Sequence, residues 1–275
     1  MRRRWMIVAL ALVIAGCAAT RPLLTGTFRI KGSDTMIILA QRWAEEYMRL
    51  NPGVSIYAEG GGTATGIEAL IRDEAEICTA SRPFQPDEVR RLMEQQRSLG
   101  ISHLVAKDAL SIYLHPDNPV RNLTVEQVRG IFTGRVTNWS MVGGNEAEII
   151  VLNRSPNSGT YLYFQEHVLE GQAYTASART MSGTAAIVKA VMENRNAIGY
   201  GGIAYGREVV HCHIDGIAPT EENVRNGSYP IARYLHLYTL EKPKGVTKSF
   251  IDWVLSREGQ MTVKKVGYIP LMEVR

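Results

Sequence analysis

Three segments of the chain repeat one pattern, in which an extended apolar run ends in small hydroxyl and glycine residues and a helical pattern follows at once. They are residues 31–35, 60–66 and 154–160. Each is typical of a strand that turns into a helix, and several such units in succession predict an α/β fold with an open sheet. The first N–H groups of a helix have no partner within it and lie at the positive end of its dipole. Three such turns therefore suggest that several helix N-termini converge on one small anion.

The N-terminus predicts export and lipid attachment. Three arginines at positions 2–4 precede an apolar run over residues 5–14, which is too short to span a bilayer. The small residues that follow, ending at Cys17, resemble a bacterial lipobox, in which the cysteine becomes the acylated first residue. We therefore expect residues 1–16 to be a signal peptide and residues 17–27 a lipidated linker, with a plain secretory signal as the alternative.

Charge and length limit what the remaining chain can be. The sequence has 31 Lys and Arg against 27 Asp and Glu, and loss of the three N-terminal arginines leaves 28 against 27. A chain so nearly neutral offers no dense basic patch, so we expect no nucleic-acid partner. The 259 residues that would remain of 275 suffice for two domains of moderate size.

Neither a metal nor a cofactor is expected. His211 and His213 fall on one face of a strand pattern, but no third ligand is placed nearby by the sequence. The glycine-rich turn lacks the Gly-Lys-Ser/Thr ending of a nucleotide-binding loop. Cys78 and Cys212 both lie in strand patterns, so we expect two unpaired, partly buried cysteines, with a disulfide as the alternative.

The order of strands and helices predicts two lobes. Alternating patterns run from residue 28, stop at Pro116-Asp117-Asn118-Pro119 and then begin again. If the strand at 232–238 pairs beside the strand at 109–115, the chain leaves lobe I near residue 112 and re-enters it near 205. This predicts lobe I at 28–112 and 205–275 and lobe II at 113–204, with ligands bound in the cleft at the carboxyl ends of the strands.

Many short motifs, in order along nearly the whole mature chain, resemble the phosphate-binding lipoproteins of bacterial phosphate ABC transporters. That resemblance implies a type II periplasmic-binding-protein fold, with two open mixed sheets, flanking helices and a two-strand hinge. The motifs that carry it include Gly32-Ser33-Asp34-Thr35-Met36, Ala80-Ser81-Arg82-Pro83, Ile131-Phe132-Thr133-Gly134, Ser158-Gly159-Thr160, Ala197-Ile198-Gly199-Tyr200 and Ser256-Arg257-Glu258-Gly259-Gln260.

The resemblance also implies the residues of a phosphate site. Position by position they are Ser33, Asp34, Thr35, Thr63, Ser81, Arg82, Arg154, Ser158, Gly159 and Thr160. Each hydroxyl could instead be only a helix cap, and Arg154 only a surface residue at a strand end.

One position departs from the family pattern. Longer members have an aspartate after the Ala-Ser that corresponds to Ala80 and Ser81, whereas this chain has Arg82. Phosphate carries a proton that a carboxylate can accept, and sulfate carries none. We therefore predict that Asp34 takes this proton and that Arg82 adds a second cation or pairs with Asp34.

Taken together, the resemblance implies a monomeric, non-enzymatic protein, attached to a membrane only through its lipid. It would capture inorganic phosphate outside the cytoplasmic membrane, close its lobes over the ion, and deliver it to an ABC permease with its ATPase subunits. A binding protein for another tetrahedral oxyanion, such as sulfate or molybdate, is one alternative. A phosphate receptor or adhesin without transport is another. Hydrolysis is disfavoured because the chain has no Gly-x-Ser-x-Gly elbow.

Overall fold

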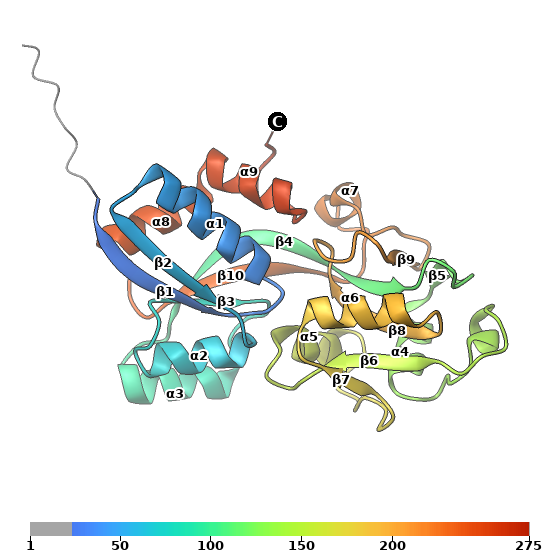
Figure 1. Cartoon of the computed structure of the whole chain (residues 1–275). Helices are drawn as coiled ribbons and strands as arrows, with labels where there is room; N and C mark the ends of the chain where they lie inside the picture. Colours follow the sequence, from blue (N-terminus) through green and yellow to red (C-terminus); the bar gives the residue numbers. More distant parts are fainter. Residues whose placement is uncertain (1–23, 275) are drawn as a thin grey trace, which may run out of the picture.

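The computed structural model describes residues 24–274, which form two sheet halves with helices on both faces of each (Figure 1). The predicted signal peptide and Cys17 lie outside the described residues. Within residues 24–274, no helix is long and apolar enough to cross a membrane, and no three His, Cys, Asp or Glu side chains are grouped to hold a metal ion.

The first half of the sheet has the strand order β2-β1-β3-β10-β4. Strands β2 and β3 run parallel to β1, while β10 is antiparallel to both β3 and β4. The strands span Gly26–Gly32 (β1), Val54–Glu59 (β2), Ile77–Ala80 (β3), Ile101–Leu114 (β4) and Ala232–Thr239 (β10).

The second half continues from the far end of β4. Its order is β4-β8-β6-β7, and β9 pairs with the other edge of β4 and with β5. The strands span Asn122–Leu123 (β5), Ile150–Arg154 (β6), Arg179–Met181 (β7), Ala197–Gly202 (β8) and Val210–Ile214 (β9). Because β4 belongs to both halves, the two sheets are continuous. The mixed α/β class expected from the sequence is confirmed.

Helices cover both faces of each half (Figure 1). In the first half α1, α8 and α9 share one hydrophobic core, and α2 and α3 enclose another on the opposite face. In the second half α4, α5 and α7 pack on one face and α6 on the other. The helices span Ile37–Leu50 (α1), Thr63–Ile71 (α2), Pro86–Gln96 (α3), Val125–Phe132 (α4), Gly159–His167 (α5), Thr184–Glu193 (α6), Glu221–Arg225 (α7), Gly245–Leu255 (α8) and Arg257–Val266 (α9), with a 3₁₀ turn at Trp139–Val142.

Helix α1 illustrates how the sequence fixes this packing. Its apolar residues recur at helical spacing and bury Leu39, Trp43 and Tyr47 along one face. Each large side chain so buried stabilises the fold by about 1.5–3 kcal/mol. Trp43 also donates its indole N–H to the carbonyl of Gly259 at 3.0 Å, which ties α1 to the start of α9. The turn that follows β1 is thereby held against a rigid helix.

The path between the halves differs from the expected one in two respects. Residues 101–114 form one long strand, and β10 pairs with its first part, residues 101–109, rather than with residues 109–115. Strand β9 pairs with the end of β4, and Tyr229 and Ile231 lie in the core of the second half. The chain therefore returns to the first half near residue 231, not near 205. The reason is that the apolar residues of 205–231 bury against β4 and α6.

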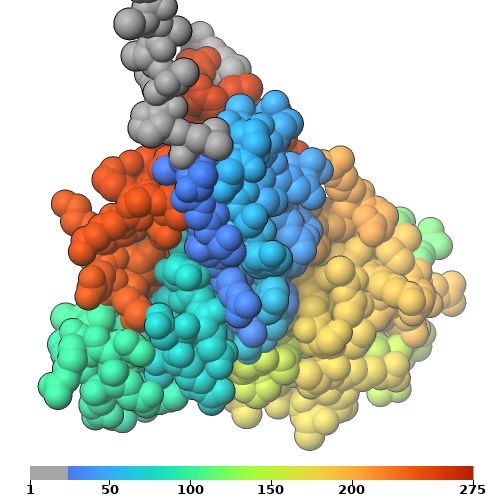
Figure 2. Space-filling model, turned by 60° about the vertical axis from the view of Figure 1, so that its left-hand side comes forward, coloured from blue at the N-terminus to red at the C-terminus, as the bar shows by residue number. Residues whose placement is uncertain are grey.

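The halves are also in contact at the surface. In Figure 2, blue and teal residues of the first half meet yellow residues of the second half without a break. Cys78 and Cys212 are buried and free, Cys78 in the core beneath α2 and Cys212 in the core of the second half.

Candidate anion-binding site

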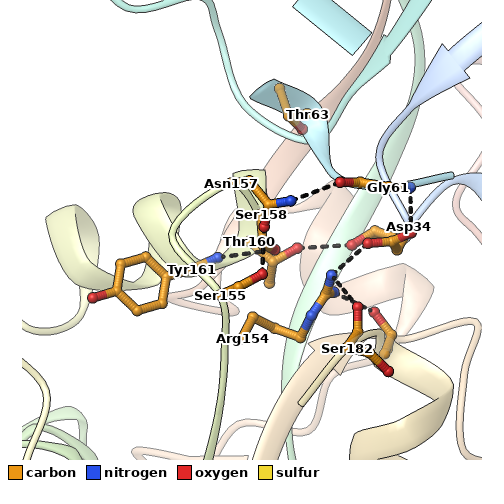
Figure 3. Close-up of polar contacts among 12 residues, drawn as sticks. Asp34, Gly61, Thr63, Arg154, Ser155, Asn157, Ser158, Thr160, Tyr161 and Ser182 are labelled. Atoms are coloured by element: carbon orange, nitrogen blue, oxygen red, sulfur yellow. Dashed lines mark hydrogen bonds and ion pairs between the residues drawn. The ribbon is translucent and has the colours of Figure 1, made fainter. Parts of the chain in front are cut away.

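The turn before α1, which carries Asp34, lies with the starts of α2 and α5 between the two halves (Figure 3). A Cβ atom placed on Gly159 would lie 2.3 Å from Thr63 Oγ1 and 2.7 Å from Ser81 Oγ. Only glycine allows so close an approach, because any side chain at this position would collide with both hydroxyls. The first turn of α5 therefore packs directly on the start of α2 and the end of β3, as the three-turn pattern predicts.

An ion pair between Asp34 and Arg154 joins the halves at the edge of the site (Figure 3). Arg154 Nη2 lies 2.5 Å from Asp34 Oδ2, and the other carboxylate oxygen accepts the N–H of Gly61 at 2.7 Å. Arg154 also donates to Thr184 Oγ1 at 3.2 Å and to the carbonyl of Ser182 at 3.4 Å. A buried pair needs such additional bonds, since its own attraction scarcely offsets the loss of hydration. Arg154 Nε is buried and has no hydrogen-bond partner.

Asn157 makes a second link between the halves, a role that was not predicted from the sequence. Its side chain donates to the carbonyl of Gly61 at 2.8 Å, and its own carbonyl accepts the N–H of Ala64 at 3.1 Å. Gly62 has φ of 101°, and a Cβ there would lie 2.7 Å from the Asn157 carbonyl oxygen. The only sequence signal for this role is the position of Asn157 between Pro156 and Ser158 in a predicted turn.

The predicted hydroxyl residues lie inside this frame. Thr35 Oγ1 and Thr160 Oγ1 are 2.7 Å apart and join the halves, and Thr63 Oγ1 accepts the N–H of Ser81 at 3.3 Å. Ser158 caps α5 by accepting the N–H of Tyr161 at 3.4 Å. Ser81 Oγ is buried without a partner. The residues Ser33, Thr35, Thr63, Ser81, Ser158 and Thr160 are all buried.

Tyrosine hydroxyls fix the turn that carries Asp34. Tyr205 donates to the carbonyl of Asp34 at 2.7 Å, and Tyr268 donates to the carbonyl of Thr35. Both tyrosines are buried, and neither was expected at the site.

Arg82 does not pair with Asp34, so that part of the prediction is wrong. Its Nη1 and Nη2 lie 2.8 and 2.7 Å from the two carboxylate oxygens of Glu88, and Nη1 also donates to the carbonyl of Pro83 at 2.8 Å. Glu88 is six residues further on, in the first turn of α3, where it closes a capping box with Gln85. Glu88 is much nearer in the sequence than Asp34, and it pairs with the guanidinium for which a pair with Asp34 was one of two predicted roles.

A second buried ion pair, Asp108 with Arg233, was missed. Arg233 Nε and Nη2 lie 3.0 and 2.8 Å from Asp108 Oδ2, and Nη2 also donates to Thr160 Oγ1 at 3.2 Å. Burial raises the pKa of Asp108, and the charge of Arg233 opposes this shift. In the sequence Asp108 follows Lys107 and Arg233 is the one Asp, Glu, Lys or Arg residue of its strand, both among apolar residues, and such charges are more often solvated than buried.

The site therefore offers many hydrogen-bond donors, two buried guanidinium groups and one partly exposed carboxylate. Together with the two-halved sheet, this defines a solute-binding protein of the PBP superfamily. The family model for the PBP superfamily domain matches residues 18–258.

Sequence relatives narrow the family further. The chain is 34% identical over 270 residues to the phosphate-binding protein PstS of Pseudomonas aeruginosa, covering 90% of this chain and 84% of that protein. It is 30% identical over 258 residues to PstS of Bacillus subtilis, covering 91% and 83%. The chain therefore belongs to the PstS family of phosphate-binding proteins.

A solved structure agrees in fold. A substrate-binding protein of the phosphate ABC transporter type from Clostridium perfringens, crystallised with bound phosphate, superimposes with a TM-score of 0.84. It is 33% identical, and the match covers 90% of this chain and all of that one.

Proposed function

We propose that this protein binds inorganic phosphate between its two halves and passes it to an ABC permease. The observation that carries the proposal is a pair of buried donors without partners, Ser81 Oγ and Arg154 Nε, in a site made of helix N-termini. A buried donor left unpaired costs about 1–3 kcal/mol, so a ligand that accepts hydrogen bonds from both is strongly favoured. The names of the relatives support phosphate as that ligand.

The proposed ligand set is the one that the sequence suggested, with a different part for Arg82. Backbone N–H groups at the starts of α1, α2 and α5 bind phosphate oxygens together with one guanidinium and the hydroxyls. These residues are Ser33, Asp34, Thr35, Thr63, Ser81, Arg154, Ser158, Gly159 and Thr160. Arg82, held by Glu88, supports the Ser81 segment instead of contacting the ion.

Asp34 is the proposed acceptor of the phosphate proton. An ionised carboxylate can accept about four hydrogen bonds, and Asp34 uses two of them, for Gly61 and Arg154. The remaining lone pairs are free to accept a P–OH proton, whereas a fully deprotonated sulfate would meet only repulsion there.

Delivery requires an open and a closed form. We propose that residues 28–109 and 232–268 form one lobe and residues 110–231 the other, so that β4 and the link at 231–232 are the hinge strands. This refines the lobe limits predicted from the sequence, because strand pairing on β4 changes from β10 to β8 between Ala109 and Leu110. Hinge closure over an ion is an ordinary motion for such a fold.

The cellular setting is part of the same proposal. The mature protein is expected outside the cytoplasmic membrane, held to a membrane surface by lipid on Cys17, monomeric and without catalytic activity. Acylation of Cys17 is tested by mass spectrometry of the N-terminal peptide from native cells and by release of a Cys17→Ser variant from membranes.

Calorimetric titration tests the function directly. The mature chain carrying Cys17→Ser is stripped of bound ion by mild unfolding and titrated with phosphate, with sulfate and molybdate as competitors. We expect a Kd for phosphate on the order of 1 μM or below, about −8 kcal/mol, with no displacement by excess sulfate. Binding of sulfate in place of phosphate would overturn the assignment of the ligand, and binding of none of the three would overturn the site.

A further inference from the structure

We infer that Arg233 is a positioning residue of the anion site: held by Asp108, it directs the hydroxyls of Thr160 and Thr35 toward the ligand and couples the site to the hinge. Nothing in the resemblance or the relatives assigns a role to either member of this pair. The inference rests on the proposed function, because the ligand that the hydroxyls face is the proposed phosphate.

The first support is the position of the pair. Arg233 on β10 and Asp108 on β4 are direct partners in the antiparallel register. Asp108 lies two residues before the point where β4 exchanges β10 for β8, and Arg233 lies two residues after Ile231, where the chain returns to the first half. The ion pair thus sits at both proposed hinge strands at once.

The second support is the set of bonds that leave the pair. Asp108 Oδ1 accepts the N–H of Ile203 at 3.0 Å, directly after β8 of the second half. Arg233 Nη2 donates to Thr160 Oγ1 at 3.2 Å, at the start of α5. The Thr160 hydroxyl in turn contacts the Thr35 hydroxyl of the first half at 2.7 Å. A continuous series of hydrogen bonds therefore joins the proposed hinge strands to both halves of the candidate site.

The third support is the direction of donation along this series of hydrogen bonds. Arg233 has no acceptor, so it can only donate, and the oxygen of Thr160 must accept from it. The two threonines have two hydroxyl protons between them, and one is used in the bond that joins them. The other proton is left free to be donated to a third group that accepts. An oxyanion is such a group, and a donor polarised by a buried cation binds it more strongly than an isolated hydroxyl does.

The fourth support is the burial of the Asp108–Arg233 pair, because removing two charges from water destabilises the fold. The side chain of Asp108 is 0% exposed and that of Arg233 is 2% exposed, and Arg233 Nη1 is buried without a hydrogen-bond partner. Replacing a buried ion pair by apolar residues is often neutral or stabilising. Stability alone therefore does not account for this ion pair, and a role at the anion site does.

The test is a double-mutant cycle on phosphate affinity. One arm replaces the pair by Asp108→Asn and Arg233→Gln together, so that no unpaired charge stays buried, and the other arm is Thr160→Val. Each arm alone is expected to weaken phosphate binding about 10- to 100-fold, the range for a hydrogen bond to a charged group. In the Thr160→Val background, the loss caused by the pair replacement should shrink to about threefold or less, because its route to the ligand is gone.

Two further variants keep the test decisive. Arg233→Lys preserves the charge beside Asp108 and loses the fork, so it should fold and still bind phosphate about tenfold more weakly. Arg129→Gln is the matched control: Arg129 is mostly buried and pairs with Glu126 and Glu170 within the second half. It should lower the melting temperature without changing the phosphate Kd by more than about twofold.

The outcomes separate this inference from the proposed function. If the unaltered protein does not bind phosphate, the proposed function fails. If it binds and Arg233→Lys or the pair replacement binds equally well, the role of Arg233 is refuted. Full additivity with Thr160→Val would also refute it, since Arg233 would then act by another route. A small-angle scattering measurement adds a second readout: phosphate should compact the unaltered protein, and the pair replacement should require correspondingly more phosphate for the same compaction.

Discussion

Arg154 and Arg82 have the same chemistry and nearly the same burial, with side chains 2% and 3% exposed, yet their ion pairs span very different parts of the molecule. Arg154 pairs with Asp34, which is 120 residues away and on the other half of the protein. Arg82 pairs with Glu88, which is six residues away in the same loop and helix. The carboxylates are also alike, 18% and 15% exposed.

The difference shows which kind of ion pair can affect ligand affinity through opening and closing of the lobes. When two lobes separate, a pair that bridges them breaks and one that lies within a loop does not. The energy of the Arg154 pair therefore enters the equilibrium between open and closed forms, whereas the energy of the Arg82 pair is the same in both. We expect mutations of the two arginines to differ accordingly, in affinity for the first and in stability for the second.

The largest expected effect follows from Arg154→Gln. This change removes the guanidinium of the site and leaves Asp34 without its partner, so phosphate affinity should fall at least about 1000-fold, or about 4 kcal/mol. Titration calorimetry measures it. The double variant Arg154→Gln with Asp34→Asn separates the two causes, because it removes the unpaired carboxylate. Phosphate binding within tenfold of the unaltered protein in both variants would contradict a ligand role for Arg154.

The next effect concerns acid stability on the Arg82 side. Arg82, Arg233 and His236 line one groove of about 720 Å³ between the loop before α3 and helix α5. Burial, with the charge of Arg233 as a smaller cause, lowers the pKa of His236 to about 4. The unfolded chain, in which a histidine has a pKa of about 6.5, therefore binds more protons between pH 6.5 and 4. Stability from this group is present at neutral pH and is lost as the pH falls through that window.

The loss between pH 7 and 4 should be about 2–3 kcal/mol, and His236→Gln should remove most of it. Urea unfolding at several pH values measures the effect, and His213→Gln, at an exposed histidine, is the control. Identical acid dependence in the His236→Gln variant and the unaltered protein would count against this assignment.

Asp34→Asn tests whether the carboxylate that pairs with Arg154 also determines the preference for phosphate over sulfate. The amide keeps one acceptor oxygen but loses the charge that repels sulfate, so the ratio of phosphate to sulfate affinity should fall about 10- to 100-fold, or about 1.4–2.8 kcal/mol. Competition calorimetry with both ions gives the ratio directly. An unchanged ratio would assign the discrimination to the hydroxyls and backbone, and Asp34 would then serve only Arg154.

Much of the fold could be predicted from the sequence, because strand and helix periods are local. The strand–turn–helix units around Asp34, Thr63 and Ser158 lie where their patterns place them. The return point of the chain could not be predicted in the same way. The return point depends on the pairing of β9 with the edge of β4. That pairing is determined by burial of Cys212 and Ile214 against residues that are distant in the sequence.

The candidate site likewise contains residues that sequence motifs identify and residues that come together only through strand pairing. The family motifs identified Thr35, Thr63 and Thr160 position by position, and each lies within two residues of a helix start. Asp108 and Arg233 carry no motif, and their relation exists only once β4 and β10 are paired in register. Arg82 was assigned from a motif position as well, but a carboxylate six residues away determined its partner.

The smallest expected effect on binding is that of Arg82→Gln. This variant tests most directly whether the Arg82–Glu88 pair, unlike the Arg154–Asp34 pair, contributes to stability and not to affinity. Glu88 holds both terminal nitrogens of Arg82 and leaves only its buried Nε without a partner, so the ligand has little of that guanidinium to gain, and phosphate affinity should change by less than about threefold. The unfolding free energy should fall by about 1.5–3 kcal/mol, because a charge-assisted pair in a buried loop is lost. Calorimetry and urea unfolding of one protein preparation give both numbers, and Glu88→Gln should reproduce the stability loss from the other side of the pair. A loss of affinity of 30-fold or more in Arg82→Gln alone would mean that the guanidinium leaves Glu88 for the ion when phosphate binds, and the local pair would then belong to the site after all.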